Sequence, residues 1–135
     1  MAKTFQLNIL APDKEFFQGE AEQIIFDTPK GRIGLMADHM AMLASVAEGL
    51  LEVCVDGKWQ TAAVGQGFAE VGGGVADLFV DTAEWAEDID VIRARQALER
   101  ASERLSSDIS HTEFLQSQAA MSRALARLRA AGGDK

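Results

Sequence analysis

Arginines in the last third of the chain have spacings that would place them on common helix faces. Residues three, four or seven apart lie on the same side of an α-helix. Guanidinium groups bind phosphates through paired hydrogen bonds, so such faces could surround an anion such as a polyphosphate. The five arginines are Arg93, Arg100 and Arg104 on one expected helix, and Arg123 and Arg127 on the next. The alternative is that these faces are solvated or paired with glutamates of the same segment, namely Glu99, Glu103 and Glu113.

Side chains that could catalyse a reaction are few. His39 follows Asp38, which leaves a small acid–base enzyme as one hypothesis, but neighbouring residues of an extended chain point to opposite faces. His111 is expected at a solvated helix start, and Cys54, inside the apolar run LLEVCV, is expected to be an inert buried thiol. The sequence contains no HExxH or CxxC motif and no phosphate-binding P-loop. We therefore expect neither an enzyme nor a metal site.

The overall composition excludes several classes of protein. The 135 residues include 13 Lys and Arg against 21 Asp and Glu, a net charge of −8, which does not favour nucleic acid as a partner. No stretch approaches the roughly 18 apolar residues that span a bilayer, and the first residues lack the apolar segment of a signal peptide. A single cysteine suits a reducing compartment. We expect a protein of the cytosol, or one that faces the cytosol.

The elements that would position the arginines fall in two unlike halves of the chain. Ten of the 12 glycines occur at or before Gly74, and residues 75–131 contain none. Residues 1–87 hold 5 basic and 14 acidic side chains, net −9, whereas residues 88–135 hold 8 and 7, net +1. Glycine-rich sequence followed by glycine-free, alanine-rich sequence predicts a β domain followed by helices. We place the two domains at residues 1–86 and 87–135.

Short strands with turn residues between them characterise the first half. The segment FQLNIL alternates apolar and polar residues, as a half-buried strand does. Asp56–Gly57 between two alternating runs predicts a hairpin with a two-residue type I′ turn. A second hairpin with a looser turn is expected around residues 72–74. Several such strands predict an antiparallel β-sandwich, or flattened barrel.

Two amphipathic helices are expected in the second half. One apolar stripe consists of Val91, Ala94, Leu98, Ala101 and Leu105, and another of Phe114, Met121, Leu125 and Leu128. Ser110 followed by Glu113 predicts a capping box at the start of the second helix. The short turn between the helices favours an antiparallel hairpin, so the fold class is α+β.

Motifs distributed over residues 5–130 together resemble a known family. The matching positions are Gly19 with Ala21, Gly31 with Gly34, His39, Gly67, Glu70–Val71, Thr82–Ala83, and Ile89–Asp90 followed by Arg93–Ala94. In this order and at these spacings, the chain resembles the epsilon subunit of bacterial F-type ATP synthases. The resemblance implies a flattened β-sandwich followed by a helical hairpin in a non-catalytic rotor subunit, without a required cofactor.

The resemblance also implies partners and a regulatory role. The sandwich would contact the gamma subunit and the c-ring, through Gly31, Arg32, Asp38 and His39, and so couple ring rotation to ATP synthesis. The hairpin would block ATP hydrolysis when it extends among the alpha and beta subunits and release that block when it folds back. The protein would then be peripheral, on the cytoplasmic face of the bacterial plasma membrane.

Some members of that family bind ATP on the folded hairpin. The corresponding positions in this chain are Ile89, Asp90, Arg93, Ala94, Arg100, Arg123 and Arg127. The resemblance therefore implies ATP as a regulatory ligand, and a free-standing ATP-binding sensor of the same architecture stays open as an alternative function. Asp90 also has a simpler role as a helix cap. The chain departs from the family at Arg32, where an acidic residue is common, and around His39, where two prolines and a glycine are absent.

Overall fold

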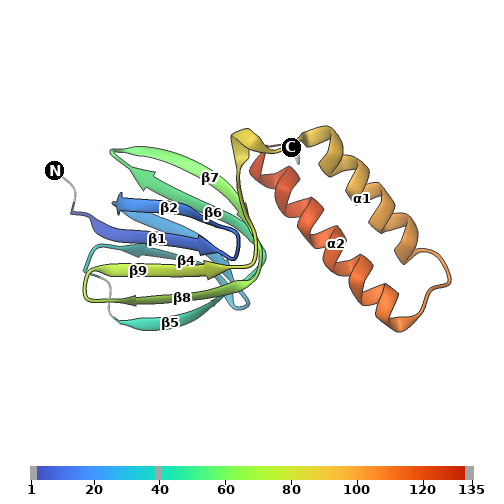
Figure 1. Cartoon of the computed structure of the whole chain (residues 1–135), viewed down its shortest axis with the longest axis horizontal. Coiled ribbons are helices and arrows are strands. Elements are labelled where there is room, and N and C mark those ends of the chain that lie inside the picture. The colour runs from blue at the N-terminus through green and yellow to red at the C-terminus, as the bar shows by residue number, and fades with distance from the viewer. Residues whose placement is uncertain (1–2, 39–40, 133–135) are drawn as a thin grey trace.

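The computed structural model describes residues 3–38 and 41–132. A β-sandwich forms one end of the molecule and a two-helix hairpin forms the other, as the sequence predicted (Figure 1). One sheet has the strand order β2 (Lys14–Ala21), β1 (Phe5–Ala11), β9 (Val75–Val80), β8 (Gly67–Gly72) and β5 (Met42–Val46). The other has the order β10 (Ala83–Trp85), β7 (Lys58–Val64), β6 (Gly49–Val55), β3 (Gln23–Thr28) and β4 (Gly31–Met36).

All strand pairs are antiparallel except β1 with β9, which run parallel with Leu7 beside Ala76 and Ile9 beside Leu78. This pair brings the first strand of the domain next to its last long strand, in the middle of the sheet. The alternation of apolar and polar residues along a strand predicts which side chains face the core, but it gives no information on the direction of the strand. The antiparallel sandwich is therefore confirmed, with one parallel pair that the sequence did not reveal.

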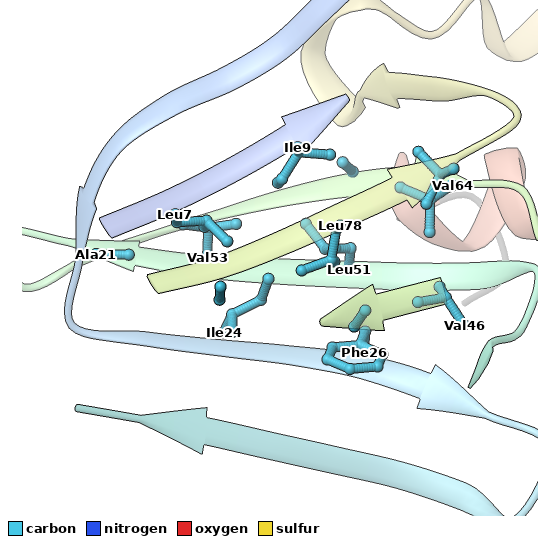
Figure 2. Close-up of a cluster of buried hydrophobic side chains, with 14 of the residues drawn as sticks. Leu7, Ile9, Ala21, Ile24, Phe26, Val46, Leu51, Val53, Val64 and Leu78 are labelled. Atoms are coloured by element: carbon cyan, nitrogen blue, oxygen red, sulfur yellow. The ribbon is translucent and has the colours of Figure 1, made fainter. Parts of the chain in front are cut away.

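The sandwich core consists of the alternate residues that each strand points inward. Leu7, Ile9, Ile24 and Phe26 have no solvent exposure, and Figure 2 shows them between the two sheets with Leu51, Val53 and Leu78. Burial of each such side chain contributes about 1.5–3 kcal/mol. The core of the sandwich is therefore built entirely from apolar side chains of its own strands.

Both predicted β-hairpins have tight turns. Asp56 and Gly57 have φ values of 53° and 75°, and Val55 pairs with Lys58, so the type I′ turn is confirmed. The second turn also has only two residues, Gly73 and Gly74, because Gly72 pairs with Val75. Their φ values of 62° and 80° are those of two left-handed residues, which glycine adopts without strain. The expectation of a looser turn was wrong.

The helical part contains a short 3₁₀ turn, η1 (Ala86–Asp88), and the helices α1 (Val91–Leu105) and α2 (His111–Ala130). Asp90 caps α1, since its Oδ1 accepts a hydrogen bond from the Arg93 N–H at 3.1 Å. Ser110 caps α2 in the same way, with its Oγ accepting from the Glu113 N–H at 3.2 Å. The two helices pack against each other as an antiparallel pair, with α2 between the sandwich and α1 (Figure 1).

The burial of the two predicted apolar stripes differs between the helices. Ala94 and Ala101 are buried, so the stripe on α1 is confirmed. On α2, Leu128 is buried, but Phe114 and Leu125 are each 39% exposed, so the predicted second stripe is only partly correct. The reason is that α2 contacts α1 on one side and the sandwich on another, and both contacts use small side chains that allow close approach.

No helix within the described part of the chain combines the length and apolarity that crossing a membrane requires.

Candidate functional site

The hairpin contacts the sandwich through a small apolar cluster on the outer face of the second sheet. On β7, Ala62 and Val64 point into the sandwich core, so Ala63 between them points outward, toward α2. We call the residues at this contact the docking cluster: Ala63, Ile89 and Ala130, with the partly buried Leu50, Ala86 and Ala131. Most of these side chains are alanines, so the cluster buries little apolar surface.

Beside the docking cluster lies a cavity of about 310 Å³, between the sandwich and the hairpin. Helix α2 contributes Arg123 and Arg127 to its wall, and α1 contributes Ala97. Glu48, from the β5–β6 connection, and Glu84, from β10, line the opposite side. The volume is in the range of small-molecule sites, and the charged groups of both signs make it a candidate functional site.

The arginines of the cavity face carboxylates of the sandwich. Arg127 donates from Nε to Glu84 Oε1 at 2.8 Å and from one Nη to Oε2 at 3.3 Å, a two-point ion pair between α2 and β10. Burial raises the pKa of Glu48; Arg123 opposes this shift, and Asp81 adds to it. Sequence reasoning missed Glu48, Asp81 and Glu84. The sequence did indicate that the sandwich is acidic, since residues 1–87 hold 14 acidic and 5 basic side chains, but not which carboxylates face α2.

The residues predicted to bind nucleotide do not all lie at the cavity. Arg123 and Arg127 line the cavity together. Arg93 and Arg100 are four residues before and three residues after Ala97, so their positions flank the cavity on the same face of α1.

The remaining predicted nucleotide residues have structural contacts. Ile89 belongs to the docking cluster, Asp90 caps α1, and Ala94 is buried on α1. Of the predicted nucleotide residues, the structure therefore places only Arg123 and Arg127 together in the wall of the cavity.

Arg104 lies away from the cavity, near the far end of the hairpin. Its Nη2 donates to Glu113 Oε2 at 2.9 Å, and its Nε donates to Ser117 Oγ at 3.3 Å. Arg104 therefore joins α1 to α2, as the alternative of pairing with glutamate predicted. A single site surrounded by all five arginines is not formed.

The three described residues that were predicted to contact partners lie at the two ends of β4. Gly31 and Arg32 begin β4, and Asp38 follows the other end of that strand. Arg32 forms ion pairs with Asp27 on the adjacent strand β3 and with Glu52 on β6, the strand beyond it. Asp38 accepts a hydrogen bond from Lys3 at 2.8 Å, which raises the pKa of Lys3. His39 lies outside the described residues.

The remaining candidate residues show no catalytic arrangement in the described part of the chain. His111 is exposed at the first position of α2. Cys54 is buried, as predicted, with its Sγ 4.0 Å from Glu22 Oε1. Residues 3–38 and 41–132 contain no group of three His, Cys, Asp or Glu side chains arranged to hold a metal ion.

Comparison with protein families gives matches over nearly the whole chain. Residues 4–86 match the beta-sandwich domain of the ATP synthase delta/epsilon chain, and residues 87–132 match the long alpha-helix domain of the same family. An ATP synthase epsilon chain from Ruminiclostridium cellulolyticum is 42% identical over 94% of this chain and 95% of its own length. The corresponding protein of Caldanaerobacter subterraneus is 40% identical over 97% of this chain and 96% of its own.

Solved structures agree with these relatives. A chain in the Euglena gracilis mitochondrial ATP synthase structure, which contains OSCP, F1 and the c-ring, is 28% identical with a TM-score of 0.84. The match covers 95% of this chain and 81% of that one. A chain in a Tetrahymena thermophila structure of the central stalk and c-ring is 13% identical with a TM-score of 0.66, over 96% and 98% of the two chains, and shares the fold. From its two matched domains and its relatives, this chain belongs to the ATP synthase delta/epsilon family, as a counterpart of the epsilon chains, which are non-catalytic subunits of the complex.

Proposed function

We propose that this protein is a central-stalk subunit of an F-type ATP synthase with a movable inhibitory hairpin. In this proposal the sandwich binds the gamma subunit and the c-ring, and so helps to couple ring rotation to ATP synthesis. The hairpin leaves the sandwich, extends toward the alpha and beta subunits and restrains ATP hydrolysis. The complex would hold the protein at the cytoplasmic face of the bacterial plasma membrane.

The observation that carries this proposal is the weakness of the contact between hairpin and sandwich. It consists of the alanine-rich docking cluster, the ion pair of Arg127 with Glu84, and a cavity in place of close packing. Partly exposed ion pairs contribute little net free energy, about 0–1 kcal/mol. Release of the hairpin would therefore leave the sandwich core intact and cost only a fraction of the free energy of unfolding.

Exposed apolar side chains on the docked hairpin support a second binding mode. Ile92 is 70% exposed and Leu115 50%, and Phe114 and Leu125 are also exposed. Contiguous apolar patches in solvent mark surfaces that another protein covers, and in this proposal these four side chains belong to such a surface in the extended hairpin. An extended hairpin could bury these four side chains against the alpha and beta subunits, which would offset the loss of the docking cluster.

The test uses an assembled complex of alpha, beta and gamma subunits. ATP hydrolysis would be measured after addition of the full chain or of residues 1–87, with co-purification confirming that both bind. We expect the full chain to lower the rate and residues 1–87 to bind without lowering it. Equal rates with both proteins would show that the hairpin does not restrain hydrolysis, and failure of both to bind would remove the rotor assignment.

For the docked state, we propose ATP as a regulatory ligand of the cavity. Arg123 and Arg127 from α2 would receive the phosphates, and the flanking positions of Arg93 and Arg100 add positive charge. Glu84 already occupies one anion position on Arg127, so ATP would have to displace it or bind beside it.

Calorimetry of ATP binding to the full chain tests this ligand. We expect binding heat that is lost in Arg123→Ala and Arg127→Ala but kept in Arg95→Ala, since position 95 lies on the other side of α1 from Ala97. Absence of heat in the unmodified chain would contradict the proposal. Submicromolar ATP affinity in a protein that does not bind gamma would instead favour the free-standing sensor.

A further inference from the structure

Asp27, on β3, holds together two parts of the sandwich that are far apart in the sequence. Its backbone oxygen accepts a hydrogen bond from the Ala47 N–H at 2.8 Å, and its Oδ2 accepts from the Leu50 N–H at 3.1 Å. Its Oδ1 accepts from Arg32 Nη1 at 2.8 Å. Asp27 therefore joins the edge strand β4 to residues 47–50, which are the β5–β6 connection and the first two residues of β6.

Residues 47–50 form one portion of the sandwich surface that contacts the hairpin, beside β7 and β10. Glu48 lines the cavity together with Arg123, and Leu50 packs in the docking cluster. Between them, Gly49 runs directly against Asp27: a Cβ at position 49 would overlap the Asp27 carboxylate. The backbone of this segment is thus shaped around one carboxylate, and a shift of that carboxylate would move both Glu48 and Leu50.

Arg32 sets the position of the Asp27 carboxylate from the edge of the sheet. The side chain of Asp27 is 19% exposed, so loss of its guanidinium partner would leave a partly buried negative charge with only the Leu50 N–H. The second hydrogen bond of Arg32, from Nη2 to Glu52 Oε1 at 2.9 Å, orients the guanidinium across β3 toward β6. Arg32 itself is at the second position of β4, where the strand has no neighbour on its other side.

We propose that Asp27 and Arg32 are positioning residues that control hairpin docking, so that the exposed edge at β4 and the release of the hairpin are energetically coupled. This inference rests on the proposed function, because coupling requires that the hairpin has docked and released states. The β4 edge contacts residues 47–50 through Asp27, and the hairpin contacts the same residues at the cavity. A segment shared by two distant sites is what physical coupling between them requires. Changes at Arg32 therefore change the docked fraction without any contact to the helices.

The experiment measures the docked fraction in the full chain by pulsed electron paramagnetic resonance. Spin labels at Gln18→Cys on β2 and Gln96→Cys on α1, both exposed positions, would report the distance between sandwich and hairpin in a Cys54→Ala background. Arg127→Ala, which breaks the direct ion pair to Glu84, serves as the reference for release. Lys3→Gln breaks an exposed ion pair at the other end of the sandwich and is the matched control.

We expect Asp27→Asn and Arg32→Gln to lower the ratio of docked to released hairpin about three- to tenfold. Lys3→Gln should leave the ratio unchanged, and Arg32→Lys should restore part of it, because a cation at position 32 still attracts Asp27. Amide hydrogen exchange separates this effect from general unfolding, since the Leu50 amide should exchange faster while the amides of β1 and β9 keep their protection.

Two results would overturn the inference. If Arg127→Ala releases the hairpin but Asp27→Asn and Arg32→Gln do not, the coupling through Asp27 is absent while the movable hairpin stands. If every variant, including Arg127→Ala, shows the docked distance alone, these contacts do not control docking in the isolated chain and the coupling fails, whereas the proposed function is tested separately by ATP hydrolysis of the assembled complex.

Discussion

The sandwich core and the docking cluster differ in the side chains that they bury. In the core, Leu7, Ile9, Ile24 and Phe26 are without solvent exposure and pack between two sheets. In the docking cluster, alanines and Ile89 cover a small area, with ion pairs around it. Large apolar side chains make the sandwich fold as a unit, whereas the hairpin contact has the composition of an interface that can open.

In the proposed function, this difference separates the binding of the rotor partners by the sandwich from the movement of the hairpin. Because the core buries much larger side chains than the hairpin contact does, we expect the sandwich to keep its structure when the position of the hairpin changes. The hairpin contact also contains charged groups, whereas the core is apolar, because carboxylates of the acidic sandwich face the arginines of α2. Mutations, salt and pH should therefore act on the two regions differently.

The largest expected effect is in the core. Phe26→Ala removes a ring that is fully buried, and we expect it to lower the free energy of unfolding by about 3–5 kcal/mol, measured by urea denaturation. Phe114→Ala is the matched control, because this phenylalanine is 39% exposed on α2, and it should cost far less. Similar costs at the two positions would contradict the contrast between the regions.

The next effect concerns the ion pair across the contact. Arg127→Ala removes both hydrogen bonds to Glu84, and we expect docking to weaken by about 1 kcal/mol, or roughly fivefold in the released population. The rate of thermolysin cleavage within α2 under native conditions measures this population. Glu84→Gln should act in the same direction, and the double variant should add little, because both changes remove one interaction. Cleavage at the rate of the unmodified chain would show that the pair does not hold the hairpin.

A smaller effect is expected from salt. At 1 M ionic strength the screening length falls to about 3 Å, which weakens the attraction between the acidic sandwich and the arginines of α2. We expect the released population to rise with sodium chloride, whereas the urea midpoint of the sandwich does not fall. A docked fraction independent of salt would mean that the apolar docking cluster alone holds the hairpin.

The smallest effect is a pH dependence at Glu48. Burial raises the pKa of Glu48 above its ordinary value of 4.5, so the folded chain binds the proton more readily than the unfolded chain. The resulting stabilisation is fully present below pH 4.5 and is lost as the pH rises through the folded pKa.

Urea denaturation between pH 4.5 and 7 checks this sign. Glu48→Gln cannot titrate, so its stability relative to the unmodified chain should increase as the pH rises. Glu87→Gln, at an exposed glutamate, is the control for the substitution itself. A relative stability of Glu48→Gln that declines toward pH 7 would contradict the assigned shift.

Much of the fold followed from local patterns. Asp56–Gly57 predicted its turn because a type I′ turn requires two residues of positive φ, and Asp90 and Ser110 predicted the two helix starts. The parallel pairing of β1 with β9 could not be predicted in this way, because the two strands are about 70 residues apart in the sequence. The alternation of apolar and polar residues also gives no information on strand direction. The exposed Phe114 was also missed, since the helical period cannot show that α2 has two neighbours.

Only the half of the candidate site that lies on α2 could be predicted from the sequence. Helical spacing identified Arg123 and Arg127, which line the cavity together. Their acidic neighbours are Glu48, from the β5–β6 connection, and Glu84, from β10, and only the folded chain brings them to α2. A site formed between domains has residues with no common local pattern, so sequence reasoning finds the half that lies on one helix.

The central claim is that the sandwich folds on its own and carries the hairpin as a separable part. Expression of residues 1–87 alone, followed by circular dichroism and urea denaturation, tests it most directly. The account predicts a soluble β protein that unfolds cooperatively, with a midpoint close to that of the sandwich in the full chain. An unfolded or insoluble fragment would show that the two regions share one core, and the movable hairpin would then have no structural basis.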